Sequence, residues 1–106
     1  LSRSMAKTLL ERRLVDVSDR LKRLRAECAV AEEQCAFLTA EADDARIRAL
    51  VSETPLADAE AQETRRHAEA QARHRDGLRR AITELERELD LLLDRMAAEP
   101  AEATPR

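Results

Sequence analysis

The chain has 106 residues, of which 39% are charged, 43% hydrophobic and only 1% aromatic, and its formal net charge is −3. A compact core of this size normally contains several aromatic residues, so a thin seam between helices fits the composition better. The small net charge excludes binding to nucleic acid or to an anionic membrane by overall charge alone. No apolar run approaches a membrane span and no signal-peptide pattern occurs, so we expect a cytoplasmic protein. The high arginine and alanine content is typical of a GC-rich bacterial genome.

A heptad stripe of apolar or small residues runs through the first half of the chain. Its members are separated by alternating steps of four and three residues, which is the a/d seam of a coiled coil. They are Leu10, Leu14, Val17, Leu21, Leu24, Cys28, Ala31, Cys35, Leu38, Ala42 and Ala45. The stripe predicts a first helix over residues 5–51, preceded by residues 1–4 as a frayed N-terminus or an expression remnant.

A break in the helical pattern follows at residues 52–54. Pro55 cannot donate a backbone hydrogen bond within a helix, and it disfavours the helical conformation at Thr54. The same two residues are typical of a helix start, with threonine as the N-cap and proline at the first helical position. The sequence therefore predicts a turn over residues 52–54 and a second helix from residue 55.

The second half of the chain carries a stripe with the same spacing. It consists of Ala57, Ala61, Thr64, Ala68, Gln71, Arg75, Leu78, Ile82, Leu85, Leu89, Leu92 and Met96. The two stripes mate if the chain folds back, with Leu21 facing Leu85 and Leu24 facing Ile82. We therefore predict an all-α antiparallel two-helix coiled-coil hairpin over residues 5–98, with the second helix at 55–98 and a tail at 99–106.

The charged residues also favour folding back. The basic block at residues 12–25 comes to lie opposite the acidic block at residues 84–94, and the acidic residues 27–41 lie opposite the basic residues 65–80. We expect ion pairs between Arg20 and Glu88 and between Arg46 and Asp58. Such exposed pairs set the orientation of the helices more than the stability of the fold.

Several apolar residues lie off the two stripes and widen the apolar surface beyond what one partner helix can cover. We interpret them as a second interface, which forms a homodimeric four-helix bundle or fits a groove of another protein. Scattered surface residues are the alternative interpretation. The candidate interface residues are Val30, Phe37, Ile47, Leu50, Val51, Leu91 and Leu93.

Two cysteines and two histidines are the candidate ligands for a metal ion. Cys28 and Cys35 are seven residues apart, too far for a disulfide within one helix, and we expect buried, reduced thiols. His67 and His74 come near Cys35 and Glu41 in the antiparallel register. None of the compact ligand spacings that are typical of zinc sites is present, so we expect no metal and no cofactor.

Catalysis has no support in the pattern. The carboxylates lie on exposed helix faces, and no glycine-rich loop or nucleophile motif accompanies them. A two-helix seam also offers no enclosed cavity in which a pKa could be shifted. We therefore expect neither an enzyme nor a protein that binds a small-molecule substrate.

The tip of the predicted hairpin is acidic and partly apolar. The residues concerned are Asp43, Asp44, Glu53 and Asp58, beside Leu50, Val51 and Leu56. Over residues 5–98 this arrangement resembles the coiled-coil arm of bacterial transcription factors of the Gre and DksA type. That resemblance implies binding of the tip in the secondary channel of RNA polymerase, with the acidic residues at its end.

The leading hypothesis from the sequence is a non-enzymatic, structural or regulatory module for protein–protein interaction that self-associates. The first alternative is a transcription regulator that binds RNA polymerase or a sigma factor through the acidic tip. The second alternative is a helical protein that binds nucleic acid through the arginines of the second helix. The pattern leaves open the choice between a dimer and a higher oligomer, and between closure within one chain and a domain-swapped dimer.

Overall fold

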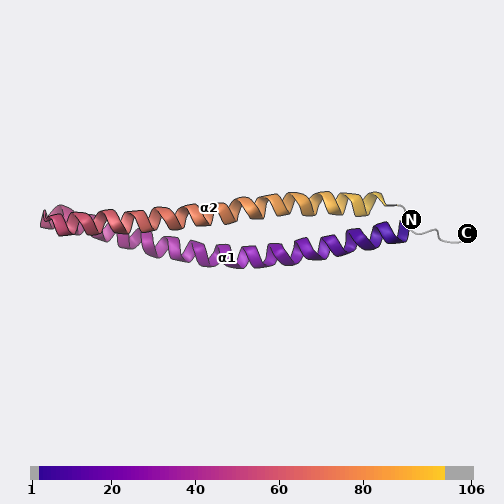
Figure 1. Cartoon of the computed structure of the whole chain (residues 1–106), viewed down its shortest axis with the longest axis horizontal. Helices are drawn as coiled ribbons and strands as arrows, with labels where there is room; N and C mark the ends of the chain where they lie inside the picture. The colour runs from indigo at the N-terminus through magenta and orange to yellow at the C-terminus, as the bar shows by residue number, and fades with distance from the viewer. Residues whose placement is uncertain (1–2, 100–106) are drawn as a thin grey trace, which may run out of the picture. The chain divides into compact units, whose positions relative to one another are not determined.

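The protein is an all-α helical hairpin (Figure 1). The computed structural model describes residues 3–99, and within that range it contains two helices, α1 (Arg3–Ser52) and α2 (Pro55–Ala98), and no strand. Helix α1 begins two residues before the predicted range of 5–51 and ends one residue after it, whereas α2 has the predicted bounds. Of the predicted end segments, residues 1–2 and 100–106 lie outside the described residues.

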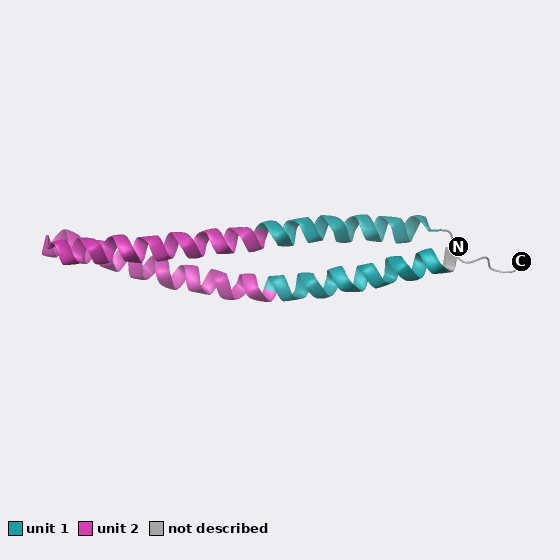
Figure 2. Ribbon diagram, viewed as in Figure 1, with its two compact units in different colours: residues 1–25, 80–106 teal, residues 26–79 magenta. Residues whose placement is uncertain are grey.

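The chain divides into two compact units (Figure 2). Unit 1 comprises residues 1–25 and 80–106, and unit 2 comprises residues 26–79. Each unit contains one segment of α1 and one segment of α2 that run in opposite directions, and the turn between the helices belongs to unit 2. The two units have seams of different composition.

Unit 1 is held together by large aliphatic side chains. Val17, Leu21, Leu85 and Leu92 are buried and form one apolar cluster. The residues that pack against this cluster are Leu10, Leu14, Leu24, Ile82 and Leu89. All nine belong to the predicted stripes, and the cluster includes both predicted facing pairs, Leu21 with Leu85 and Leu24 with Ile82. Burial of apolar area stabilises a fold by about 25 cal/mol per Å². This stabilisation is therefore concentrated in the leucine-rich unit.

Unit 2 has a seam of small side chains. Its buried residues are Cys28, Ala31, Cys35, Ala45 and Ala49. Small side chains allow the two helices to approach closely, but each of them removes little apolar area from water. The α2 side of this seam also contains polar residues, which are satisfied by neighbours. Gln71 donates a hydrogen bond to Gln34 across the seam at 2.9 Å, and Arg75 Nε lies 3.0 Å from Asp76 Oδ1.

The turn in unit 2 consists of Glu53 and Thr54. Glu53 adopts the left-handed conformation with φ of 52°, and its N–H donates to the carbonyl of Ala49 at 3.0 Å, which is the αL motif that ends many helices. Thr54 Oγ1 then accepts a hydrogen bond from the N–H of Ala57 at 3.2 Å, as expected for an N-cap. The chain therefore reverses direction within two residues.

The left-handed conformation of Glu53 leads to a stability prediction. A residue with a Cβ atom is strained in this conformation, whereas glycine is not. We expect Glu53→Gly to raise the free energy of unfolding by about 0.5–1 kcal/mol in urea denaturation. As a control, Ser52→Gly places glycine in the last helical residue and should lower stability by up to about 1 kcal/mol. A Glu53→Gly protein less stable than the parent would contradict this account of the turn.

Ion pairs flank the seam in both units. In unit 1, Arg13 donates to Glu88 and Arg25 donates to Glu86 at 3.0 Å. In unit 2, Arg48 donates to Glu60 at 3.2 Å and Arg79 donates to Glu32 at 2.9 Å. Opposite charges therefore meet across the seam, as the charge blocks predict.

The two specific ion pairs expected from the sequence are wrong. Glu88 pairs with Arg13, which lies one heptad before Arg20 on the same flank of α1. The pair near the turn is Arg48 with Glu60. Arg46 instead lines a shallow hollow that it shares with Arg65.

Candidate functional site

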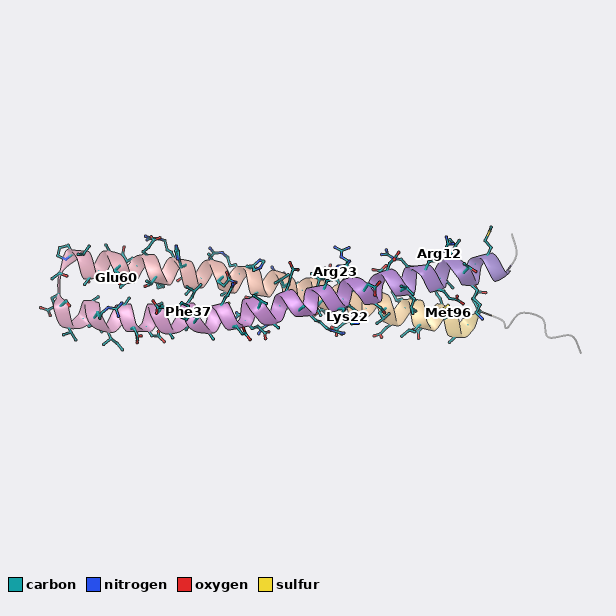
Figure 3. The ribbon with its side chains drawn as sticks, turned by 90° about the horizontal axis from the view of Figure 1, so that it is seen from below. Arg12, Lys22, Arg23, Phe37, Glu60 and Met96 are labelled. Carbon is teal, nitrogen blue, oxygen red and sulfur yellow. The ribbon has the colours of Figure 1, made fainter. Side chains whose placement is uncertain are left out.

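The candidate interface residues of unit 2 lie on the outer face of α1, the side turned away from α2. With the seam positions counted as a and d, this face consists of positions b, c and f. Its apolar residues in unit 2, which we call the outer patch, are Val30, Phe37, Ile47, Leu50 and Val51, and all five are exposed. Phe37, labelled in Figure 3, is 65% exposed although it is the only aromatic residue of the chain. An exposed set of this kind is typical of a surface that meets another protein.

The outer face of α2 in unit 2 is charged. Arg66 pairs with Glu63 at 2.6 Å, and Arg65 pairs with Glu69 at 3.5 Å, both within one helical turn. Apolar residues are accordingly distributed around α1 but gathered on one side of α2. Of the large apolar residues of unit 2 that are exposed, all but Leu56 near the turn therefore belong to α1.

The remaining candidate interface residues, Leu91 and Leu93, lie on α2 in unit 1. Both are exposed, and they flank Leu92, which is buried in the seam. Successive helical residues point about 100° apart, so Leu91 and Leu93 emerge on opposite sides of the seam. The structure thus does not combine them into one surface.

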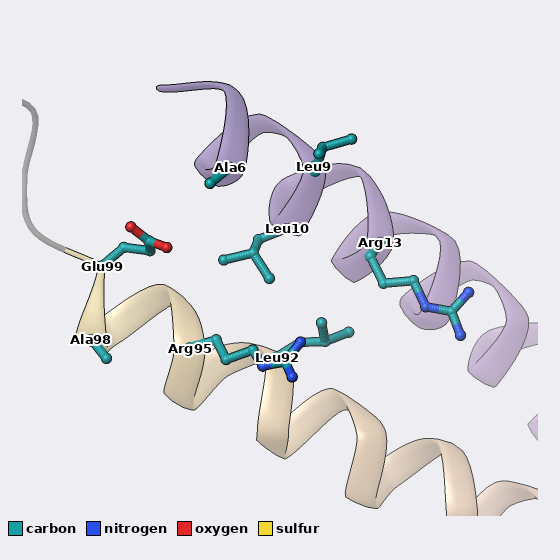
Figure 4. A pocket seen from close by; sticks show the side chains of 8 residues that line it. All are labelled: Ala6, Leu9, Leu10, Arg13, Leu92, Arg95, Ala98 and Glu99. Carbon is teal, nitrogen blue, oxygen red and sulfur yellow. The ribbon is translucent and has the colours of Figure 1, made fainter. Parts of the chain in front are cut away.

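An open groove lies between the two helices of unit 1, near the chain ends (Figure 4). Leu10 and Leu92 point into the space between the helices, and Leu9 points away from α2. Arg13, Arg95 and Glu99 supply charged side chains around this apolar floor. Sequence reasoning missed this groove, because Ala6, Ala98 and Glu99 lie at the ends of the stripes, where spacing alone does not predict a hollow.

The predicted acidic tip is only partly acidic in the structure. Glu53 lies in the turn, and Asp58 lies in the first turn of α2, where negative charge suits the helix dipole. Asp43 instead lines a hollow together with Arg46 and Arg65. Near the turn, Leu50, Val51 and Leu56 are exposed. The tip therefore combines carboxylates, arginines and apolar side chains.

The ion pair between Arg79 and Glu32 in unit 2 has a resolved electrostatic effect. The hydrogen bond from Arg79, together with its positive charge, holds the pKa of Glu32 below its ordinary value of 4.5. The thiol of Cys28 lies 3.7 Å from the same carboxylate and lowers its pKa further. Glu32 thus links a buried seam residue to an arginine of α2.

This pair predicts a pH dependence of stability. Because the pKa of Glu32 is depressed in the folded chain, its contribution is fully present above the unfolded value near 4.5 and is lost as the pH falls through the folded value. We expect Glu32→Gln to be less stable than the parent at pH 7, with the difference vanishing at low pH. Urea titrations between pH 7 and pH 2 measure it, with the exposed Glu84→Gln as the control. An equal difference at both pH extremes would contradict the linkage.

The cysteines and histidines form no metal centre within residues 3–99, where no group of three or more candidate ligands comes together. Cys28 and Cys35 are buried free thiols, as predicted. His67 Nε2 lies 3.3 Å from Glu63 Oε1 on the same helix. The helices, over the part that the structure describes, include none that is both long and apolar enough to cross a membrane.

Comparison with known proteins adds no identification. No protein-family model, no curated protein and no solved structure matches this chain.

Proposed function

We propose that this chain is a non-enzymatic protein–protein interaction module that self-associates, with the hairpins of a dimer forming a four-helix assembly. The observation that carries the proposal is the outer patch on α1, above all the exposed Phe37. Aromatic side chains are the most common anchors of protein interfaces, and leaving one in water forfeits the burial of a large apolar area.

The composition of the seam supports the same proposal. In unit 2 the helices meet through alanine and cysteine, so the contact between them buries little apolar area. A lone pair of helices with a seam of this kind is marginal without further tertiary contacts. A second copy packed on α1 supplies those contacts and covers the outer patch.

The test is the solution mass by light scattering over a concentration series, with helicity followed in parallel. We expect a dimer that dissociates on dilution, and Phe37→Asp should raise the dissociation constant by at least about tenfold, because it buries a charge in the interface. The matched control is Ala70→Asp, which adds the same charge to the exposed side of α2 in unit 2. A parent chain that stays monomeric, or a Phe37→Asp chain that dimerises equally well, would refute the proposal.

A second candidate function is transcription regulation through binding of the tip to RNA polymerase or a sigma factor. Its support is Glu53, which carries a carboxylate although its backbone adopts a left-handed conformation that favours glycine. Under this proposal Glu53→Gly yields a folded hairpin that no longer binds in a pull-down with RNA polymerase, as do alanine substitutions of Asp43, Asp44 and Asp58. Undiminished capture by these variants would exclude a role for the tip.

Nucleic-acid binding has less support. Arg65, Arg66 and Arg79 are engaged with carboxylates, which offsets the positive charge that phosphates would need.

Two free thiols support placement in a reducing compartment such as the cytoplasm.

A further inference from the structure

The outer face of α1 in unit 2 carries charge of one sign only. Over residues 26–51, positions b, c and f consist of the five residues of the outer patch, four alanines and three carboxylates, without a lysine or an arginine. The carboxylates are Glu33, Asp43 and Asp44, and all three are exposed. The exposed apolar residues of the outer patch therefore lie among negative charges.

Two of these carboxylates have arginines beside them. Asp43 shares a hollow with Arg46 of α1 and Arg65 of α2, so its charge is offset in part within the chain. Asp44 precedes Arg48 by one helical turn, but that arginine donates a hydrogen bond to a glutamate of α2 at 3.2 Å. These arginines lie at the flanks of α1 that border the seam, at positions e and g, and not on its outer face.

The third carboxylate, Glu33, has no basic residue within one turn along α1. The residues three and four positions away on either side are Ala29, Val30, Ala36 and Phe37. The helices of unit 2 differ in the same sense, since α1 has six carboxylates and two arginines over residues 26–52, whereas α2 has five of each over residues 55–79. The excess of negative charge therefore lies on the helix that carries the outer patch.

This combination favours a partner that is both apolar and basic. A second copy buries the apolar residues, but its own outer face brings the same carboxylates into the interface. An amphipathic helix with an apolar stripe flanked by lysine or arginine buries the same residues and also meets opposite charge. The electrostatics of the outer face thus discriminate against a second copy and in favour of a basic helix.

We propose that the outer face of α1 in unit 2 binds a basic amphipathic helix of another protein, in competition with a second copy of this chain. The inference goes beyond the self-association proposed above and does not depend on it. Phe37, which is 65% exposed, is the apolar anchor. Glu33 and Asp44 supply the charge that selects the basic helix.

Synthetic peptides test this selection on the full chain. The probe is a helical peptide of about three heptads with leucine at positions a and d and lysine at e and g. The matched peptide has glutamate in place of every lysine. Fluorescence anisotropy of the labelled peptides measures binding over a range of ionic strength. We expect the basic peptide to bind at least about tenfold more tightly than the acidic one, with a difference that shrinks as salt is added.

Neutralising the outer face should change the two interactions in opposite directions. Glu33→Gln with Asp44→Asn should weaken binding of the basic peptide by about threefold to tenfold, because two exposed charge pairs are lost. The same variant should tighten self-association in light scattering, because repulsion between two copies is reduced. The matched control is Glu63→Gln with Glu69→Gln, which removes two exposed carboxylates from the outer face of α2 in the same unit. It should leave both affinities nearly unchanged.

Phe37→Ala locates the peptide on the outer patch and should weaken its binding by at least about tenfold, with helicity as the check on folding. Equal binding of the two peptides overturns the inference, as does binding of the basic peptide that neither Phe37→Ala nor neutralisation of the outer face weakens. Self-association would stand in those cases if the parent still dimerised. A parent that binds the basic peptide but stays monomeric supports this inference and refutes self-association.

Discussion

The Leu21→Ala substitution is expected to lower the free energy of unfolding by about 2–4 kcal/mol. Leu21 is 1% exposed and is one of four buried residues in the cluster of unit 1. Truncation removes three heavy atoms from a site where the surrounding leucines cannot collapse fully, so a cavity adds to the lost transfer free energy. Urea denaturation at one fixed protein concentration measures the effect, since the proposed self-association would make stability depend on concentration.

Leu56→Ala is the matched control for this prediction. It makes the same chemical change outside the outer patch, where Leu56 is 81% exposed. We expect a change within about 0.5 kcal/mol, because this side chain already contacts water in the folded hairpin. If the two substitutions lowered the free energy of unfolding equally, the aliphatic burial that stabilises the chain would not be concentrated in unit 1.

Ala45→Leu has the second largest expected effect, and its cause is overpacking rather than a cavity. Ala45 is 1% exposed in the small-residue seam of unit 2. A leucine at this position forces the helices apart or adopts a strained rotamer, so we expect a loss of about 1–3 kcal/mol in the free energy of unfolding. A seam that instead gained stability from the added apolar area would show that the helices do not approach closely there.

The control for overpacking is Ala70→Leu, an exposed position on α2 in the same unit. Alanine and leucine have similar helix propensities, so this change should be nearly neutral. Urea denaturation of the two variants separates steric strain in the seam from any general effect of leucine. The pair of experiments also distinguishes unit 2, where small size matters, from unit 1, where large size matters.

The difference between the units bears on the proposed function. Unit 1 contains the aliphatic cluster, and its exposed leucines are divided between opposite sides of the seam. Unit 2 has the thinner seam and also the outer patch. The segment that gains least from its own partner helix is thus the one that offers most to another chain, as expected for a hairpin whose stability depends on self-association.

The amino-acid sequence by itself determined the helices, their antiparallel pairing and the place of the turn. Heptad spacing depends only on the pitch of the α-helix, so the stripes predicted which residues meet, from Leu21 and Leu85 to the alanines of unit 2. Pro55 and Thr54 acted through local backbone sterics and capping, and these operate whatever the rest of the chain does. The exposed positions of the outer patch followed from the same spacing.

Only the tertiary structure decided which charged side chains pair and where the surface is hollowed. Arg13 and Arg20 share a heptad flank, so the choice of Arg13 by Glu88 depends on side-chain positions that spacing does not specify. The groove around Leu10 and Leu92 likewise arises from the packing of two helices against each other. The register of α-helical residues is a local property, whereas ion pairs and grooves depend on the distance between elements, which a periodic pattern does not contain.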